Sequence, residues 1–277
     1  MLGTVTRAAD EQKIERPEAA SIAAIEKELG GRLGVAILDT GDGRRLEYHA
    51  VDRFPMCSTF KFLAAAAVLR RVDENQEQLE RKISYGPGDL QAWAPVTKQH
   101  LQEGNITLDA LCAAAVEYSD NTAANILLQT IGGPDGLTQY VRSLGDSITR
   151  LDRNEPTLNT ALEGDERDTT NPVSMLNDLQ ALLLDEKLSV SARQRLETWL
   201  RECKTGDKRL RAGLPSTWNI GDKTGTGDNG AAGDVAIARP PNRAPLLIVA
   251  YTVGSTATKE KINGAFAAIG SFIAENF

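Results

Sequence analysis

The sequence predicts an α/β fold with an all-α insertion, in which an antiparallel sheet is flanked by helices. Strand patterns are confined to the two ends of the chain, whereas the middle is helical almost throughout. Because strands from both ends must share one sheet to be buried, we expect a discontinuous α/β domain over 17–52 and 205–277. The remaining residues, 53–204, form the expected helical domain, which includes an active-site loop over 150–168.

At the N-terminal end, the spacing of Ile22, Ile25 and Leu29 predicts a helix over 17–30 that ends at two glycines. The apolar run 33–39 predicts a buried strand, and a glycine-containing turn joins it to a second strand at 45–50. Residues before this helix lack a periodic pattern, so we expect 1–16 to be a ragged lead-in.

The helical middle begins with an apolar segment over 59–72, TFKFLAAAAVLRRV, which is typical of a buried helix. Asn171 and Pro172 predict the cap and first turn of a later helix. The further helices are expected at 107–117, 120–131, 135–144, 172–185 and 191–202. The sheet then resumes with strands at 217–224, 231–238 and 246–253, and a last helix over 258–275 packs on it.

A long polar segment separates two of these helices, between residues 145 and 170. Compact domains rarely keep so long a loop without a functional reason. Arg153 and Asp168 stand near its two ends, where a partly buried ion pair would close the loop.

Composition excludes several classes of protein and of site. Hydrophobic residues make up 41% and charged residues 25% of the 277, as in soluble globular proteins. A net charge of −7 argues against a nucleic-acid partner, and no apolar run is long enough to predict a membrane span. Three cysteines without close spacing and only two histidines argue against a zinc site, so we expect neither a metal ion nor another cofactor.

Ser58 and Lys61 form an S-x-x-K pair at the start of the buried helix. A spacing of three places both side chains on one helix face, and the helix N-terminus supplies free N–H groups and a positive potential. Burial lowers the pKa of a lysine amine toward the range where it accepts a proton from a serine. The alternative is a capping serine and a lysine whose amine reaches solvent.

Three other motifs are equally weak when each is taken alone. Ser119-Asp120-Asn121 opens a helix, where it either caps the helix or projects a hydroxyl and an amide into a cleft. Glu155 and Asn159 lie in the long loop, where a carboxylate and an amide four residues apart can hold one water between them. The alternative for Glu155 is a solvated loop acid.

Lys-Thr-Gly occurs twice, and the two copies have different contexts. At Lys204-Thr205-Gly206 it follows a helix, so the glycine is expected to end that helix and the lysine to complement its dipole. At Lys223-Thr224-Gly225 it follows a strand pattern, where the lysine and threonine can face a cleft and the glycine lets a substrate approach the backbone. We take 223–225 as the functional copy.

Together the four motifs occur in the order S-x-x-K, S-D-N, E-x-x-L-N and K-T-G, and the sequence thereby resembles the class A serine β-lactamases over about residues 17–277. The resemblance implies the fold of the serine β-lactamases and transpeptidases. It also implies that Ser58 becomes acylated by the β-lactam carbonyl, with proton transfer shared by Lys61 and Glu155. Ser119 then relays a proton to the departing ring nitrogen.

The same resemblance implies the substrate contacts and the deacylation step. Glu155 and Asn159 activate the water that hydrolyses the acyl-enzyme, and the backbone N–H groups of Ser58 and Thr226 form the oxyanion hole. The residues expected to contact the substrate are Asn121, Asn159, Lys223, Thr224, Gly225 and Thr226. Trp93 lies where the family often has an aromatic residue at the cleft rim, although a core tryptophan is an equal alternative.

Two departures from the family pattern change these expectations. Many members carry an arginine on the strand after K-T-G, but Ala232 stands there, and Arg209 matches an alternative position for that charge. Cys112 would pair with the position of Ala65, and Cys57 with that of Gly227, so neither disulfide of the family can form. Absence of the second one weakens a carbapenemase assignment.

Two other functions share parts of this apparatus. A D-alanyl-D-alanine peptidase has the serine, lysine and K-T-G elements but does not need Glu155 and Asn159. A non-hydrolysing β-lactam sensor domain would lack a working deacylation base. The resemblance therefore favours an enzyme with a small-molecule β-lactam substrate, expected to be a monomer. Although the first residues lack a signal-peptide pattern, the location of the substrate favours a periplasmic or secreted protein.

Overall fold

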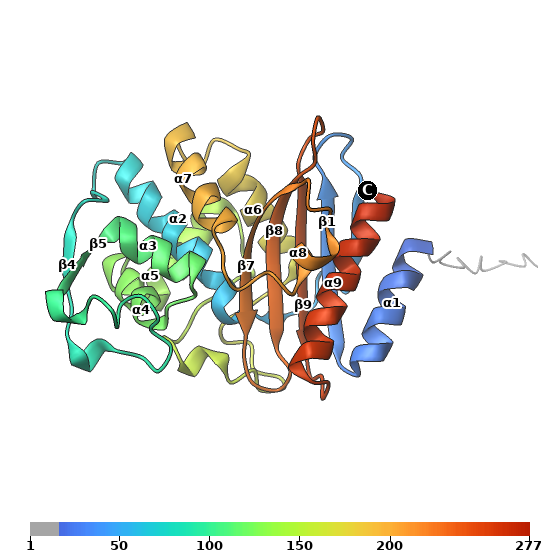
Figure 1. Ribbon diagram of the computed structural model, residues 1–277, viewed down its shortest axis with the longest axis horizontal. Helices are drawn as coiled ribbons and strands as arrows, with labels where there is room; N and C mark the ends of the chain where they lie inside the picture. Colours follow the sequence, from blue (N-terminus) through green and yellow to red (C-terminus); the bar gives the residue numbers. More distant parts are fainter. Residues whose placement is uncertain (1–16) are drawn as a thin grey trace, which may run out of the picture.

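A five-stranded antiparallel sheet forms the centre of the computed structural model, which describes residues 17–277 and leaves the expected lead-in outside. Its strand order is β2-β1-β9-β8-β7, so strands from the two ends of the chain lie side by side, as predicted (Figure 1). The strands are β1 Arg32–Asp39, β2 Arg45–Tyr48, β7 Asn219–Thr226, β8 Ala232–Arg239 and β9 Leu246–Val253.

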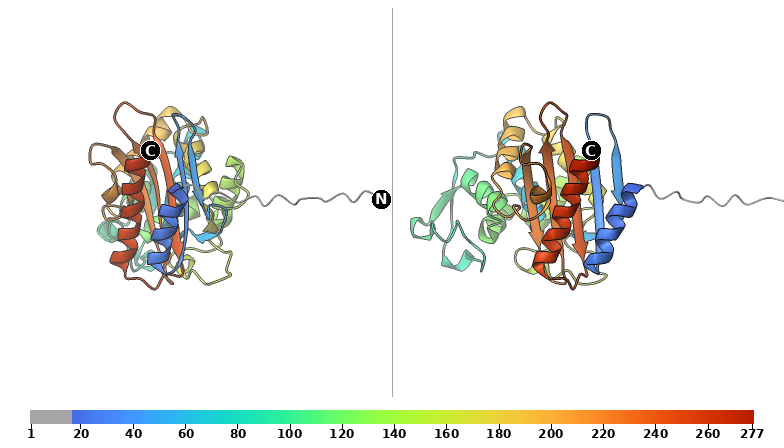
Figure 2. Two further views of the ribbon diagram at one scale, coloured as in Figure 1. Left: turned by 90° about the vertical axis from the view of Figure 1, so that its right-hand side faces the viewer. Right: turned by 45° about the vertical axis from the view of Figure 1, so that its right-hand side comes forward.

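Helices cover both faces of this sheet, as the views in Figure 2 show. On one face lie α1 Pro17–Leu29, α8 Leu210–Gly213 and α9 Lys259–Asn276. On the other lie α2 Phe60–Asp73, α3 Leu108–Glu117, α4 Asn121–Thr130, α5 Gly133–Leu144, α6 Pro172–Leu183 and α7 Val190–Arg201. Two buried apolar clusters, one on each side of the sheet, account for the strands being apolar on both faces.

The alternation of side chains along β1 illustrates this double burial. Val35 and Ile37 join the cluster beneath α1 and α9, whereas Ala36 and Leu38 join the cluster beneath the other helices. Gly34 has a third role, because a Cβ atom there would lie 2.4 Å from the ring of Phe54. The strand therefore needs glycine at this point to let the aromatic ring pack on it.

The local signals that predicted the helices are found in the structure. Every residue of α2 from Phe60 to Leu69 is buried, in agreement with its apolar sequence. The side chain of Asn171 accepts a hydrogen bond from the Ser174 N–H and so caps α6. No helix among residues 17–277 is long and apolar enough to cross a membrane.

The differences from prediction concern short elements and strand ends. Strand β7 begins and ends two residues later than expected, and β2 ends at Tyr48 rather than at 50. The unpredicted strands have two or three residues each: β3 Phe54–Pro55, β4 Lys82–Ser84, β5 Asn105–Thr107 and β6 Thr169–Thr170. Strands this short do not show the alternation of apolar and polar residues from which a strand is predicted. The limits of the two domains remain a prediction.

Candidate active site

The structure places Ser58 where α2 meets the end of strand β7. A short 3₁₀ turn, Cys57–Thr59, leads into α2, and Cys57 before the serine has a φ of +45°. A Cβ atom on Gly225 of β7 would lie 3.1 Å from the Ser58 nitrogen and 2.7 Å from the carbonyl oxygen of Met56. Only glycine therefore lets β7 approach the nucleophile this closely, which brings the next residue, Thr226, beside it.

Lys61 lies one turn further along α2 and has no exposed surface. Its Nζ lies 2.9 Å from Glu155 Oε1, and it donates to Asn121 Oδ1 at 2.6 Å and to the Ser119 carbonyl at 2.9 Å. Burial lowers the pKa of the Lys61 amine, while the neighbouring Glu155 opposes this shift. The amine is thus held among acceptors and is easier to deprotonate than a surface lysine.

Glu155 reaches the nucleophile directly. Ser58 Oγ donates to Glu155 Oε1 at 3.1 Å, and Asn159 Nδ2 donates to Glu155 Oε2 at 2.5 Å. The sequence hypothesis required these distant residues to converge, and it would have failed had they lain apart. Asn159 Oδ1 is buried and accepts no hydrogen bond from residues 17–277.

Ser119 lies between two buried lysines. Lys223 Nζ donates to Ser119 Oγ at 3.1 Å, and Lys61 Nζ lies 3.4 Å from the same oxygen. Asp120 caps α4 by accepting a hydrogen bond from the Ala123 N–H. The capping interpretation of the S-D-N motif is therefore confirmed for its middle residue, while its outer residues contact the lysines and keep their functional role as a prediction.

The other Lys-Thr-Gly copy also reaches the site, which the sequence did not predict. Thr205 Oγ1 and Thr224 Oγ1 are 2.5 Å apart, and Lys204 and Thr205 both line the cleft. Lys223 is completely buried, and this burial lowers the pKa of its amine to about 8. The expected functional copy thus contributes the buried amine, and the 204–206 copy contributes part of the cleft wall.

Arg209 is 4% exposed and lies behind β7. Its Nη1 donates to the carbonyl oxygens of Gly225 and Gly233, both at 2.6 Å. Its Nη2 donates to Thr226 Oγ1 at 2.6 Å, and Thr226 pairs across the sheet with Ala232. The guanidinium therefore reaches the end of β7, beside Ala232 on the neighbouring strand.

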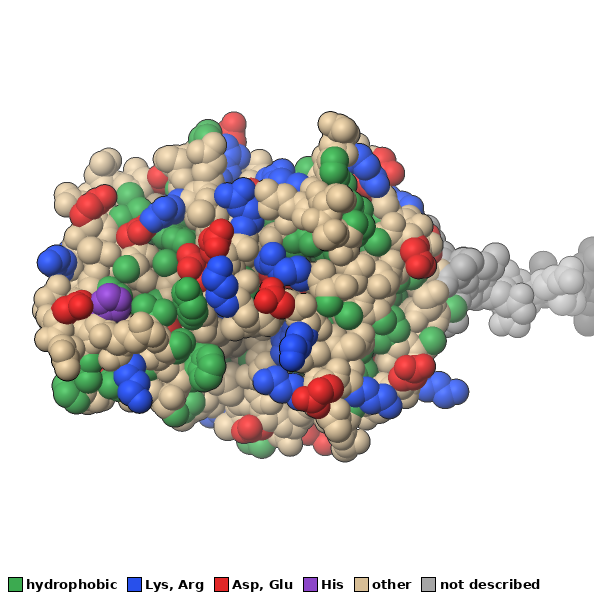
Figure 3. Space-filling view, viewed as in Figure 1, with side chains coloured by type: hydrophobic (Ala, Val, Ile, Leu, Met, Phe, Trp, Pro, Cys, Tyr) green, Lys and Arg blue, Asp and Glu red, His purple; other side chains and the backbone are tan. Residues whose placement is uncertain are grey.

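A cleft of about 900 Å³ opens beside Ser58, and the buried side chains of Lys61, Glu155 and Lys223 lie behind its lining. Figure 3 shows the face that contains it, where Lys and Arg side chains gather around the middle. Trp93 is 56% exposed and lines the cleft, so it is a rim residue and not a core residue. The other predicted residues that line it are Ser58, Ser119, Asn121, Asn159, Arg209, Thr224 and Thr226.

The loop that carries Glu155 is closed by polar contacts. Arg153 Nε and Asp168 Oδ2 form the predicted ion pair at 2.6 Å, and the Asp168 side chain has no exposed surface. Asn125 of α4 accepts a hydrogen bond from the Glu155 N–H and donates one to the Glu155 carbonyl, each at 2.9 Å. The sequence analysis missed Asn125, because a single amide on a helix carries no distinguishing signal.

Asn263 of α9 was missed for the same reason, although its Oδ1 accepts a hydrogen bond from Arg209 Nε at 3.0 Å.

All three cysteines are buried as free thiols. Burial and the nearby Glu155 raise the pKa of the Cys57 thiol to about 12. Cys57 is therefore not a competing nucleophile beside Ser58.

The arrangement offers a hydroxyl nucleophile, a carboxylate and two buried amines within hydrogen-bonding reach of one another. The carboxylate contacts both the hydroxyl and the first amine, and the second serine contacts both amines. Such a set of groups can remove a proton from a nucleophile and deliver one to a leaving group during acyl transfer, and it needs no histidine to do so.

Comparisons with known proteins agree with this geometry. A model of the β-lactamase enzyme family matches residues 17–277. The chain is 48% identical over 227 residues to β-lactamase OXY-2 of Klebsiella oxytoca, which covers 82% of this chain and 78% of that protein. It is 44% identical over 256 residues to β-lactamase CTX-M-8 of Citrobacter amalonaticus, with 92% and 88% covered.

Solved structures are similar over nearly the whole chain. An ancestral class A β-lactamase superposes with a TM-score of 0.93 and 51% identity, over 94% of this chain and 100% of that one. The structure of PenP from Rhodopseudomonas palustris superposes with a TM-score of 0.93 and 50% identity, over 95% of this chain and 100% of that one.

Proposed function

The chain belongs to the class A β-lactamase family, and from this premise we propose the role of each side chain in its cleft. As a serine β-lactamase it hydrolyses β-lactam antibiotics and so confers resistance to them. The observation that carries the proposed roles is the contact of Glu155 Oε1 with both Ser58 Oγ and Lys61 Nζ.

Acylation begins when Ser58 Oγ attacks the carbonyl carbon of the β-lactam ring. The serine proton moves to the Glu155–Lys61 pair, whose carboxylate already accepts a hydrogen bond from this hydroxyl. The backbone N–H groups of Ser58 and Thr226 stabilise the negative oxygen of the tetrahedral intermediate. Close approach of β7 at Gly225 supports this pairing of two amides from distant parts of the chain.

Opening of the ring requires a proton for the departing nitrogen. Ser119 Oγ is the proposed donor, because it lies between the amines of Lys61 and Lys223 and can be reprotonated from either. Asn121 contacts the amide side chain of the substrate through its Nδ2, since its Oδ1 is occupied by Lys61.

Deacylation uses a water held by Glu155 and Asn159. The carboxylate removes a proton from this water, and the unpaired Asn159 Oδ1 accepts the water's second hydrogen. The resulting hydroxide attacks the ester carbonyl, the bond from this carbon to Ser58 Oγ breaks, and the serine oxygen takes back a proton from the Glu155–Lys61 pair. A peptidase or a sensor domain does not need a water activated by a carboxylate and an amide. Glu155 therefore distinguishes a β-lactamase from both alternatives.

The substrate carboxylate is bound at the end of β7 by Lys223, Thr224 and Thr226, and Arg209 supplies the charge that Ala232 cannot. Arg209 donates to Thr226 Oγ1, which leaves the threonine's own hydrogen free for the carboxylate. Arg209→Ala is expected to raise KM for penicillins by about tenfold or more, as loss of a charged hydrogen bond predicts. An unchanged KM would remove Arg209 from the substrate site.

Turnover of benzylpenicillin and of a chromogenic cephalosporin tests the whole assignment. Repeated turnover is expected, and a single stoichiometric burst would instead indicate a sensor. Glu155→Ala should accumulate an acyl-enzyme with a mass increase equal to that of the intact antibiotic. If this variant turns over at the parental rate, the deacylation role of Glu155 is wrong.

We also propose that the protein is exported to the periplasm or secreted, because its substrates act outside the cytoplasm. We further propose that it is a monomer, as the resemblance to the class A enzymes implies. Cell fractionation and size-exclusion chromatography test these two statements, and a stable dimer in solution would contradict the second.

A further inference from the structure

A row of glycines crosses the central sheet beside the turn that carries Ser58. Tyr251 of β9 pairs with Gly34 of β1 on one side and with Gly233 of β8 on the other. Gly233 in turn pairs with Gly225 of β7. Because paired residues of antiparallel strands point to the same face of a sheet, these four positions form one row. Tyr251 is the one member of this row that has a side chain.

The glycines leave the space that two aromatic rings occupy. A Cβ atom on Gly233 would lie 2.4 Å from Tyr251 Cε1, and one on Gly34 would lie 2.4 Å from Phe54 Cε2. The Phe54 and Tyr251 rings stack with their centroids 6.3 Å apart, and neither side chain is exposed. The Tyr251 ring is therefore fixed by packing against the backbone of β8 and against a second ring.

The Tyr251 hydroxyl contacts the turn that contains the nucleophile. Tyr251 Oη lies 2.8 Å from Thr59 Oγ1, and Thr59 Oγ1 donates to the Met56 carbonyl at 2.8 Å. Because a threonine hydroxyl has one hydrogen, Tyr251 is the donor in the first of these contacts. Burial raises the pKa of the Tyr251 phenol, so the phenol keeps this hydrogen at neutral pH.

The Met56 carbonyl closes the turn around Ser58. It accepts a second hydrogen bond from the Thr59 N–H at 3.1 Å, and the Met56 N–H donates to the Asp168 carbonyl at 2.9 Å. Inside the turn, Cys57 has a φ of +45°, which residues with a side chain keep only where surrounding contacts hold them. The Thr59 hydroxyl is one of the contacts that hold this conformation.

The turn packs against β7 where the oxyanion hole is proposed. A Cβ atom on Gly225 would lie 2.7 Å from the Met56 carbonyl oxygen and 3.1 Å from the Ser58 nitrogen. The carbonyl that Thr59 holds therefore helps to set how closely Ser58 approaches β7. The donors of an oxyanion hole are effective because their positions are fixed before the negative charge develops.

On the basis of the oxyanion hole proposed above, we propose that Tyr251 is a positioning residue for both chemical steps. Through Thr59, its hydroxyl fixes the turn that carries Ser58 against β7. The N–H groups of Ser58 and Thr226 then keep the spacing that binds the oxyanion. Tyr251 is completely buried and does not line the cleft, so it acts without contacting the substrate. Acylation and deacylation both depend on it, because each passes through a tetrahedral intermediate.

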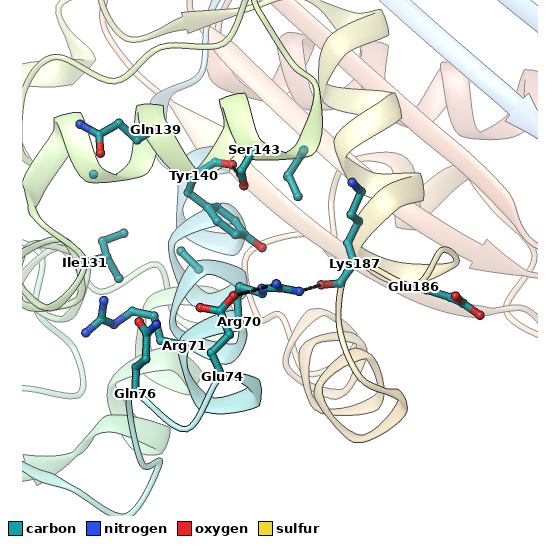
Figure 4. Close-up of a pocket in the computed structure, with 13 residues that line it drawn as sticks. Arg70, Arg71, Glu74, Gln76, Ile131, Gln139, Tyr140, Ser143, Glu186 and Lys187 are labelled. Carbon is teal, nitrogen blue, oxygen red and sulfur yellow. Dashed lines mark hydrogen bonds and ion pairs between the residues drawn. The ribbon is translucent and has the colours of Figure 1, made fainter.

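Tyr251→Phe tests the proposal, and Tyr140→Phe is the matched control. The Tyr140 hydroxyl is also buried, but it has no hydrogen-bond partner among residues 17–277. Tyr140 lines a separate cavity of about 460 Å³ between α2 and α5, where Figure 4 shows it. Removal of this hydroxyl should leave acylation and deacylation at the parental rates.

Tyr251→Phe is expected to slow acylation by benzylpenicillin and deacylation by about tenfold each, because a small displacement of an oxyanion donor is costly. The dissociation constant of the initial complex should stay unchanged, since the contacts of the cleft with the substrate remain. Stopped-flow acylation and the decay of a preformed acyl-enzyme measure the two steps. Parental rates for both steps would overturn the proposal.

Two substitutions of Thr59 test the same contacts without changing the tyrosine. Thr59→Ser keeps the hydroxyl and should retain the parental rates, whereas Thr59→Val should match Tyr251→Phe. A variant with both Tyr251→Phe and Thr59→Val should lose no more than either single variant, because the two substitutions remove one chain of contacts. Losses that multiply in the double variant would show that Tyr251 does not act through Thr59.

The affinity for phenylboronic acid separates positioning from a loss of stability. Its tetrahedral adduct with a serine hydroxyl resembles the oxyanion intermediate, so its Kd should rise about tenfold in Tyr251→Phe and in Thr59→Val. Urea unfolding identifies a temperature at which both variants are fully folded. An unchanged Kd would overturn the positioning role alone. A parent that neither turns over benzylpenicillin nor binds phenylboronic acid would contradict the proposed function, and this inference with it.

Discussion

The two parts of the molecule that meet at Ser58 are held in place by different forces. Helix α2, which carries Lys61 and directly follows the turn that carries Ser58, is buried along ten consecutive residues and is fixed by apolar packing. The loop that carries Glu155 buries Leu151 and Leu158 in the same core and adds polar contacts, such as Asn125 with the Glu155 backbone and Arg153 with Asp168. The nucleophile thus rests on the core, whereas the deacylating carboxylate depends in addition on a set of individual hydrogen bonds.

This difference separates the two chemical steps. Attack on the ring uses groups on α2, α4 and β7, whereas release of the acyl group needs the loop in its place as well. Changes in the packed part should therefore reduce acylation, and changes in the loop contacts should trap the acyl-enzyme. The following variants test that division, beginning with the one expected to have the largest effect.

Lys61→Met is expected to reduce the acylation rate by about a thousandfold, within the usual range for loss of general acid–base catalysis. Methionine fills much of the same space but leaves Glu155 and Asn121 without the cation that contacts both. Stopped-flow acylation with a chromogenic cephalosporin measures this rate. If the variant acylates at the parental rate and accumulates acyl-enzyme, Lys61 acts in deacylation and the acylation role proposed here is wrong.

Asn125→Ala removes both hydrogen bonds that hold the Glu155 backbone to α4. We expect kcat to fall by about a hundredfold through slow deacylation, since the carboxylate loses its position, with a much smaller change in acylation. Mass spectrometry under turnover should detect the acyl-enzyme. Asn276→Ala, at the exposed end of α9, is the control and should leave both steps unchanged.

The same division explains which features the sequence could predict. Helix α2 and strands β1, β8 and β9 follow from apolar periodicity, because burial acts on many residues in a regular pattern. The chemical residues followed from motifs at fixed local spacing and from the resemblance they support. Both kinds of signal lie within short stretches of sequence.

What was missed depends on contacts between residues far apart in the chain. Asn125 forms a hydrogen bond with Glu155, thirty positions later in the sequence, and Thr205 forms one with Thr224, nineteen positions later. A single amide or hydroxyl has many possible partners, and only the packed structure selects one. The predicted Arg153–Asp168 contact succeeded because two opposite charges at the ends of one loop have few alternatives.

A pH titration distinguishes substrate capture from release. Burial lowers the pKa of Lys223 to about 8, so its amine is charged at pH 7 and becomes neutral as pH rises through that value. We expect kcat/KM to fall by up to tenfold per pH unit above about 8, because the substrate carboxylate loses a cation. Deacylation of a preformed acyl-enzyme should be less sensitive to this group.

Lys223→Arg is the control for that titration, since arginine stays charged throughout the range. If the guanidinium can still reach the substrate, the alkaline decline in kcat/KM should disappear, whatever the absolute rate of the variant. A decline that persists unchanged would assign it to another group.

Arg153→Gln should also slow deacylation, but less than Asn125→Ala because Arg153 does not hold the Glu155 backbone, and its main effect should be on stability. The Arg153 side chain is 18% exposed and its partner Asp168 is fully buried, so the variant leaves a buried carboxylate without its cation. We expect a loss of about 2 kcal/mol in unfolding free energy. Arg167→Gln breaks the pair with Asp165, where the arginine is 50% exposed, and should cost less than about 0.5 kcal/mol. Equal losses in urea unfolding would mean that the loop is not closed by its buried ion pair, and that polar anchoring there is weaker than the geometry implies.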